Sequence, residues 1–106
     1  MENYHHRAEL IIDLQDRGYD QDFVIDNHGI LNIQQSELLA PEEFEVTETH
    51  LVSERPSEGG CFMVCGIKSI HSDIKGILVT PYGRLFQGLS SHLWAKFSSS
   101  ITIDAL

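Results

Sequence analysis

Two apolar runs in the second half of the chain constrain its fold most strongly. They cover residues 61–67 and 74–80, and a short polar segment at residues 68–73 separates them. That segment contains Ser and Asp but no Pro. Two runs of β-forming residues joined by turn-forming residues are typical of a β-hairpin. The sequence therefore predicts an antiparallel hairpin at the centre of a sheet.

Residues 23–26 and 30–34 predict a first hairpin earlier in the chain. The two short β-type runs flank Asp26-Asn27-His28-Gly29, in which Asp and Asn favour a turn and Gly29 tolerates a left-handed conformation. Each run alternates apolar and polar positions, with Phe23 and Ile25 on one face of the first run. One face of this hairpin is therefore expected to pack on a helix.

Residues 45–54 predict a third, weaker strand. Its alternation is imperfect, because Val46 would share a face with the charged side chain of Glu48. Charged side chains on a strand suit the edge of a sheet, where they prevent unwanted pairing. Every connection between these strands, except residues 36–43, is too short for a parallel crossover. We therefore expect an antiparallel sheet of about five strands.

The N-terminal part of the chain predicts a helix over residues 4–17. Leu10, Ile11 and Leu14 lie on one face of that helix, which is the pattern of a helix that packs on a core. Gly18 stands where a left-handed residue commonly ends a helix.

A second helix is predicted near the C-terminus. Ser90 or Ser91 caps it, and Leu93, Trp94 and Phe97 form its apolar stripe. The stripe is interpreted as part of the core.

These elements define an α+β fold in which both helices cover one face of the sheet. At 106 residues the chain is expected to form a single domain over residues 1–106, since two halves would be too small to be stable alone. Residues 36–43 are expected to be a brief helix or turn, residues 55–60 a loop, and residues 98–106 a docked strand or a frayed end. The predicted core consists of Leu10, Leu14, Ile25, Leu31, Val64, Ile77, Val79, Leu93 and Phe97.

The charge of the chain argues against binding to nucleic acid. The net charge is −9, whereas nucleic-acid-binding surfaces need clustered Lys and Arg. Residues 1–58 contain 14 acidic and 3 basic side chains, and residues 59–106 contain 2 acidic and 4 basic ones. The acidic half is either a solvated surface or a surface for a basic partner. Because no apolar run approaches the roughly 20 residues of a membrane span, and no leader segment is visible, we expect a cytoplasmic protein.

Two enzymatic alternatives follow from the cysteines and histidines. Cys61 and Cys65 would lie about 13 Å apart on one face of a strand, too far for a disulfide. Either could act as a nucleophile with a histidine, His50 and His71 being the best placed, although an apolar run is a poor environment for a reactive thiol.

A metal site is the other chemical alternative. It would use His28 with Asp26, or His71 with Asp73, at a spacing of two residues in a turn.

Three motifs resemble a family of short bacterial proteins of about 100 residues. The motifs are Arg17-Gly18-Tyr19, Pro41-Glu42-Glu43-Phe44-Glu45, and Lys75-Gly76-Ile77-Leu78-Val79 followed by Tyr82-Gly83. The resemblance covers residues 8–97 and implies the fold of these uncharacterised proteins. Many of them carry the label phosphoribosylpyrophosphate synthetase.

The chemistry in that label does not extend to this chain. The paired acids Glu42-Glu43 are followed by Phe44, without the Gly- and Thr-rich loop that holds a phosphate. Gly59-Gly60 is followed by Cys61, not by the Lys-Ser or Lys-Thr of a Walker loop.

The sequence therefore favours a non-enzymatic module that binds a protein partner or regulates it. The alternative is a protein that binds an anion or a phosphate ligand, or an enzyme related to the synthetase label. No cofactor or metal is expected, and a homodimer through the edge strand is an open possibility. An anion site would need Lys68, Lys75 and Arg84 to converge on one face of the sheet. The candidate binding residues are Lys68, Lys75, Tyr82, Arg84 and Trp94.

Overall fold

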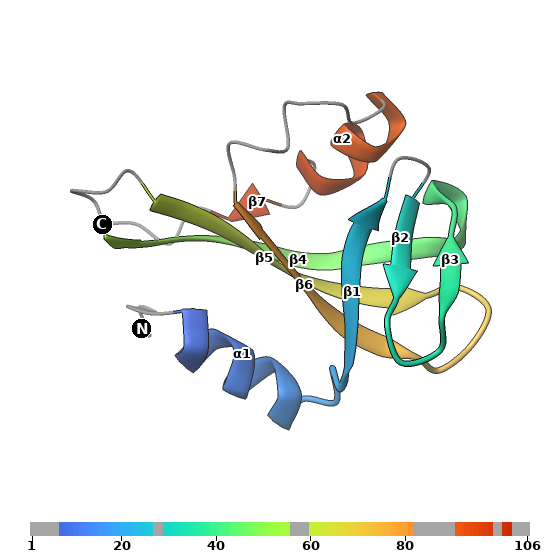
Figure 1. The fold of residues 1–106 in the computed structure, drawn as a ribbon, viewed down its shortest axis with the longest axis horizontal. Coiled ribbons are helices and arrows are strands. Elements are labelled where there is room, and N and C mark those ends of the chain that lie inside the picture. The colour runs from blue at the N-terminus through green and yellow to red at the C-terminus, as the bar shows by residue number, and fades with distance from the viewer. Residues whose placement is uncertain (1–6, 27–28, 56–59, 82–90, 99–100, 103–106) are drawn as a thin grey trace.

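The computed structural model describes residues 7–26, 29–55, 60–81, 91–98 and 101–102 of the chain (Figure 1). They form seven strands, two α-helices and one short 3-10 helix. In chain order the elements are α1 (Arg7–Asp16), β1 (Gln21–Asp26), β2 (Gly29–Asn32), β3 (Glu37–Leu39), η1 (Pro41–Glu43), β4 (Phe44–Arg55), β5 (Gly60–Ser69), β6 (Lys75–Pro81), α2 (Ser91–Ser98) and β7 (Ile101–Thr102).

The strands form one mixed sheet of seven strands in the order β3-β2-β1-β6-β5-β4-β7. The β1 strand runs parallel to β6, with Asp22 opposite Ile77. The two-residue β7 runs parallel to β4. The prediction of an antiparallel sheet of about five strands is therefore wrong. Short connections exclude parallel pairing only between consecutive strands, whereas both parallel pairs join strands that are distant in the sequence.

Both hairpins predicted from the sequence are confirmed. The β5 and β6 strands pair antiparallel from Phe62 opposite Pro81 to Lys68 opposite Lys75. The β1 and β2 strands pair antiparallel, and their last paired residues are Asp26 and Gly29. Most of the predicted loop at residues 55–60 lies outside the described residues.

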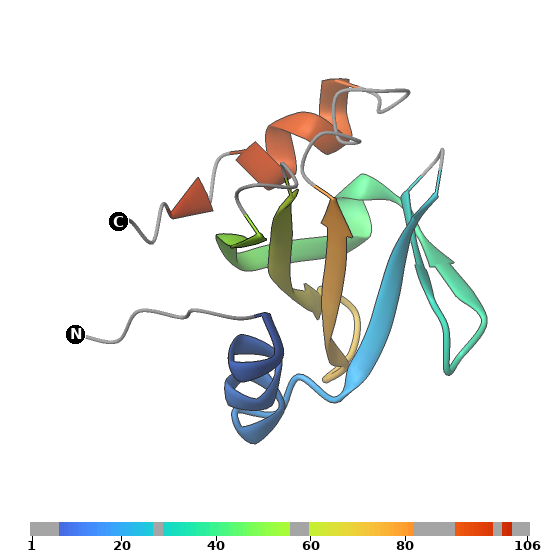
Figure 2. The same ribbon diagram turned by 60° about the vertical axis from the view of Figure 1, so that its left-hand side comes forward.

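The two α-helices cover opposite faces of the sheet, which corrects the prediction that both lie on one face (Figures 1 and 2). Side chains alternate along β5, so Val64 packs with Leu14 of α1, while Met63 packs with Phe97 of α2. The sheet is thus buried between two separate apolar clusters. This arrangement requires consecutive apolar residues in the central strands, and the run at residues 61–67 supplies them.

Most of the predicted core is confirmed. The side chains of Leu10, Leu14, Val64, Ile77, Leu93 and Phe97 are buried. Ile25, Leu31 and Val79 are only half-buried. The inward face of β2 carries Ile30 and Asn32, because Ile30 lies opposite Ile25 and Asn32 lies opposite Phe23.

Residues 36–43 differ from the predicted helix or turn. Glu37–Leu39 is the edge strand β3, and only Pro41–Glu43 is helical. Leu39 faces the core and Leu38 faces the opposite side of the sheet, as successive residues of a strand do.

A β-bulge explains the imperfect alternation in β4. Val46 lies opposite Ile67 and Glu48 lies opposite Gly66, so Thr47 is an extra residue in β4. The bulge shifts the phase of the strand, as bulges do. Val46 therefore packs on the α2 side of the sheet, whereas Val52 packs on the α1 side.

Candidate functional site

Of the five predicted binding residues, the structure describes the side chains of two and the backbone of a third. Lys68 and Lys75 lie opposite each other on β5 and β6. Trp94 belongs to α2, although its side chain is outside the described part of the chain. Tyr82 and Arg84 also lie outside the described residues. The proposed convergence of Lys68 and Lys75 with Arg84 is therefore seen only for the two lysines.

Lys75 has a structural role at the end of α1. Its Nζ donates a hydrogen bond of 2.9 Å to the carbonyl oxygen of Arg17 and lies 4.3 Å from the centre of the Tyr19 ring. A cation that bonds the last carbonyls of a helix stabilises the helix end. The ammonium group of Lys75 is thus occupied by α1 and Tyr19.

Helix α1 ends as the sequence predicted. Gly18 has a φ of 100°, which is the left-handed region that glycine tolerates. The Gly18 N–H donates to the carbonyl of Gln15, and the Tyr19 N–H donates to that of Leu14. This pair of bonds is a Schellman motif. It directs the Tyr19 side chain back onto the sheet.

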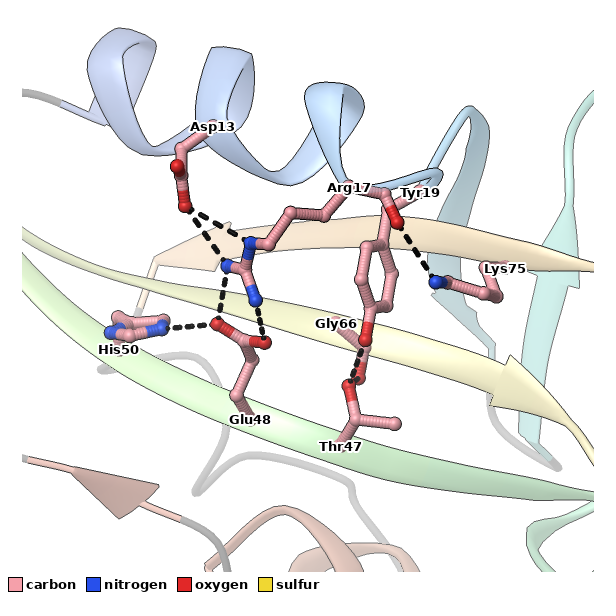
Figure 3. A network of polar contacts seen from close by, with 8 residues as sticks. All are labelled: Asp13, Arg17, Tyr19, Thr47, Glu48, His50, Gly66 and Lys75. Atoms are coloured by element: carbon pink, nitrogen blue, oxygen red, sulfur yellow. Dashed lines mark hydrogen bonds and ion pairs between the residues drawn. The ribbon is translucent and has the colours of Figure 1, made fainter.

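Tyr19 then packs over the bulge in β4. Its hydroxyl lies 2.9 Å from Thr47 Oγ1, and the Thr47 hydroxyl donates to the carbonyl of Gly66 (Figure 3). A Cβ atom at Gly66 would lie 3.0 Å from the Tyr19 ring and 2.7 Å from Thr47 Oγ1. Glycine at position 66 therefore makes room for this contact.

An ion-pair network holds the same end of α1 to β4 (Figure 3). Arg17 donates two hydrogen bonds of 2.8 Å to the two carboxylate oxygens of Glu48. It also contacts Asp13 Oδ2 at 3.0 Å, and His50 Nε2 lies 2.8 Å from Glu48 Oε1. We call Asp13, Arg17, Glu48 and His50 the Arg17–Glu48 network. It links residues that are far apart in the sequence through a bidentate pair, the strongest form of surface ion pair.

The network lowers the pKa of Glu48. The main cause of the lowered pKa is the hydrogen bond that Arg17 donates to Glu48, and the hydrogen bond with His50 also lowers it. Glu48 in turn raises the pKa of Arg17. Glu48 is therefore a carboxylate held in its charged form, which suits a structural ion pair better than an acid catalyst.

Replacing Glu48 with Gln is expected to lower the free energy of unfolding by about 1 kcal/mol near neutral pH, because the pair is bidentate but partly exposed. A carboxylate whose pKa is lowered by folding stabilises the folded state above its unfolded pKa of about 4.3, and this stabilisation disappears at lower pH. The difference between wild type and Glu48→Gln should therefore shrink as the pH falls below about 4. Urea unfolding at several pH values measures it.

The control variant for this prediction is Arg17→Lys. Lysine keeps the charge but loses the bidentate geometry, so this variant should retain part of the pH dependence. A difference between wild type and Glu48→Gln that stays constant from neutral to acid pH would contradict the role assigned to the ion pair.

The structure places Cys65 and His50 on opposite faces of the sheet. Cys65 is a free thiol in the cluster under α2, and it accepts a hydrogen bond from the Thr49 hydroxyl at 3.7 Å. His50 lies opposite Val64, the residue before Cys65 in β5. Val64 packs on the α1 side of the sheet, so His50 points to that side as well. Burial raises the pKa of the Cys65 thiol to about 12. Cys65 cannot be activated by His50 in this arrangement.

Metal binding and membrane insertion can also be compared with the structure. Within the described residues, no group of three or more His, Cys, Asp or Glu side chains is placed to hold a metal ion. Among the same residues, neither helix is long and apolar enough to cross a membrane.

An exposed row of apolar side chains crosses the strands at the β3 end of the sheet. Val24 of β1 lies opposite Leu31 of β2, and Leu31 lies opposite Leu38 of β3. The exposed fractions are 41% for Val24 and 46% for Leu38, and Leu31 between them is half-buried. Side chains directly opposite each other in a sheet lie about 5 Å apart. We call this continuous row of Val24, Leu31 and Leu38 the apolar strip.

The apolar strip lies on the α1 face of the sheet, beyond the area that α1 covers. Phe23, Ile30 and Leu39 adjoin the strip residues in the chain and point into the cluster under α2. The strip must therefore point the other way. Helix α1 packs mainly on β5 and β6, and Figure 2 shows β2 and β3 at the edge of the sheet away from α1.

Acidic side chains flank the β1 end of the apolar strip. Asp22 and Asp26 are exposed and lie two residues to either side of Val24, on the same face of β1. Residues 18–54, which include β1, β2, β3 and nearly all of β4, contain nine Asp and Glu but no Lys or Arg. A surface of this kind has a negative potential.

Sequence reasoning did not identify the strip, although part of its signal was present. The long gap between Arg17 and Arg55 without a basic residue is visible in the sequence. The exposed face of β2 could not be assigned, because Ile30-Leu31-Asn32-Ile33 has an apolar residue on each face. The register between β1 and β2 determines which face of β2 is exposed.

Comparison of the chain with protein-family models, with curated proteins and with solved structures gives no match. The functional argument therefore depends on the geometry of the chain itself.

Proposed function

We propose that this chain is a non-enzymatic module that binds a basic protein partner through the apolar strip. The observation that carries the proposal is the row of Val24, Leu31 and Leu38, which is exposed at both ends and flanked at Val24 by the exposed carboxylates of Asp22 and Asp26. Exposed contiguous apolar surface marks sites of interaction. The surrounding carboxylates favour a partner rich in Lys and Arg, and they disfavour nucleic acid and a second copy of the same acidic surface.

The state of the reactive side chains supports a binding role over an enzymatic one. The Cys65 thiol is buried and its pKa is raised to about 12, so it is a poor nucleophile. Glu48 and Lys75 are engaged in contacts that hold α1 on the sheet. These groups therefore stabilise the fold that presents the strip.

Immobilised protein incubated with an extract of the source cells tests the proposal. We expect wild type to retain a protein rich in Lys and Arg, and the double variant Val24→Thr, Leu38→Thr to retain about tenfold less of it, since apolar contact area is lost. Threonine keeps the β propensity and the charge of each position. Raising the salt concentration should weaken the retention, because exposed charges are screened.

The control variant is Ile70→Thr. Ile70 is 50% exposed and belongs to the turn between β5 and β6, not to the strip. It should retain the partner as wild type does. Equal retention by wild type and the double variant, or retention of an acidic protein, would show that the strip is not the binding surface.

We also propose a cytoplasmic location. A buried free thiol suits a reducing compartment, which supports a cytoplasmic location. We also propose membership of the short bacterial family, on motifs that each have a role in the fold. Gly18 ends α1, Pro41 begins η1, and Gly76 lies where a Cβ atom would meet the Phe23 ring.

A further inference from the structure

We infer that the partner binds as an extended strand added to the open edge of β3, with apolar and basic side chains in alternation. This inference rests on the proposed function, and it specifies the conformation and the side-chain pattern of the bound segment. The β3 strand ends the sheet order and pairs with β2. Addition of a strand to such an edge is a recurrent mode of peptide recognition.

The hydrogen-bond alternation of the sheet places the backbone of Leu38 at this edge. The Ile33 N–H donates to the carbonyl of Asp22, so odd-numbered residues of the β2 segment direct their backbone groups toward β1. Ile30 and Asn32 must then face β3, where they lie opposite Leu39 and Glu37. Leu38, between these two, therefore directs its N–H and C=O away from β2 and toward the open edge.

The two faces of β3 specify the side chains of an added strand. Leu38 continues the apolar strip on the α1 side, so a partner residue beside it on that face should be apolar. Exposed Glu37 lies on the opposite face, so the partner residues that alternate with the first should be basic. Opposite charges on adjacent strands are favourable and like charges are not. A segment that alternates apolar and basic residues meets both requirements.

A second copy of this chain fits the edge poorly. Two β3 strands paired antiparallel through Leu38 would place the Glu37 side chains of both copies on the same face, in diagonal positions that long side chains can reach. Like charges across an interface oppose association. The acidic surroundings therefore favour a basic segment over self-association.

The probe for this inference is a synthetic peptide of about ten residues that alternates Val and Lys, with a Val and Glu peptide as its counterpart. Binding is measured by nuclear magnetic resonance titration of the intact protein. We expect the Val and Lys peptide to bind and to shift the amide signal of Leu38 and its neighbours, and we expect no binding of the Val and Glu peptide. Absence of binding by the Val and Lys peptide would overturn the inference.

A matched pair of variants at Leu38 separates strand addition from contact with the side chain alone. Leu38→Ala removes most of the side chain and keeps the N–H, whereas Leu38→Pro keeps apolar surface and removes the N–H. Proline is tolerated on an edge strand when its N–H would face outward. If strand addition occurs, Leu38→Pro should bind the peptide about fivefold more weakly than Leu38→Ala, through one lost hydrogen bond.

A second measurement uses wild-type protein only and does not depend on the folding of a variant. The Val and Lys peptide is methylated on the alternate backbone nitrogens that would pair with β3, and its affinity should fall by at least the same factor. Equal affinity of both peptides, or equal affinity of Leu38→Pro and Leu38→Ala, would overturn strand addition.

The outcomes also distinguish this inference from the proposed function. Loss of peptide binding in Val24→Thr, Leu38→Thr, together with equal binding by the proline and alanine variants, would leave the strip as the binding surface and exclude the strand mode. Wild-type binding by the double variant would overturn both. Concentration-dependent dimerisation of wild type that Leu38→Pro abolishes would assign the edge to a second copy, and would also overturn the inference.

Discussion

Replacing Gly29 with Ala is expected to lower the free energy of unfolding by about 3 kcal/mol, near the upper end of overpacking effects. A Cβ atom at this position would lie 1.9 Å from the carbonyl oxygen of Leu39 and 2.9 Å from its carbonyl carbon. Because these are backbone atoms of β3, no side-chain rotation can relieve the clash. The β3 strand would have to move away from β2, and the buried pair Ile30 and Leu39 would separate.

Thermal and urea unfolding measure this effect, with Gly18→Ala as the control. Gly18 has a φ of 100°, but a Cβ atom there would come no closer than 3.4 Å to the Lys75 side chain. Its replacement should therefore cost only the strain of a left-handed residue, about 1 to 2 kcal/mol. Gly29→Ala should also weaken peptide binding, because β3 carries Leu38. A Gly29→Ala loss no greater than that of Gly18→Ala would show that β3 separates from β2 at little cost.

The parts of the fold that depend on neighbouring residues could be predicted from the sequence. Gly18 ends α1 with a left-handed conformation that few other residues adopt. The β5 and β6 hairpin follows from two β-forming runs and a short polar turn. In both cases the residues that determine the structure lie within a few positions of one another.

The parts that depend on distant residues could not be predicted in this way. The parallel pairing of β1 with β6 joins Asp22 to Ile77, and no local pattern indicates which strands will be neighbours. Gly76 lies opposite Gln21 in this pairing. A Cβ atom at Gly76 would lie 2.5 Å from the Phe23 ring, so glycine makes room for that ring. Once β6 is at the centre of the sheet, both of its faces need covering. The helices are therefore divided between them.

The candidate site also depends on residues that are distant in the sequence. The acidic first half of the chain is compatible with a solvated surface or with a surface for a basic partner, and the proposal keeps the second alternative. The sequence indicates Lys68 and Lys75 as binding residues by their charge alone, whereas Lys75 donates its hydrogen bond to the Arg17 carbonyl because of the path of α1. The sequence predicts a helix or turn around Leu38, and the exposure of Leu38 at the sheet edge follows only from the pairing of β2 with β3.

Replacing Phe97 with Ala is expected to lower the free energy of unfolding by about 3 to 5 kcal/mol, the usual cost of truncating a buried aromatic residue. Phe97 is fully buried, and its ring centre lies 6.2 Å from that of Phe44. The α2 helix has only eight residues, and isolated helices of that length are unstable in water. Its helical structure therefore depends on the contacts that Phe97 and Leu93 make with the sheet.

Loss of the Phe97 contact should release α2 before the rest of the fold unfolds. Amide hydrogen exchange should then show reduced protection in α2 and in β7, which follows it, with little change in β5 and β6. The control is Phe97→Leu, which keeps an apolar side chain and should cost about 1 to 2 kcal/mol. Because β7 pairs with β4 at Thr49 and His50, release of α2 would also free the second edge of the sheet. Unchanged protection of α2 in Phe97→Ala would show that other contacts hold the helix on the sheet.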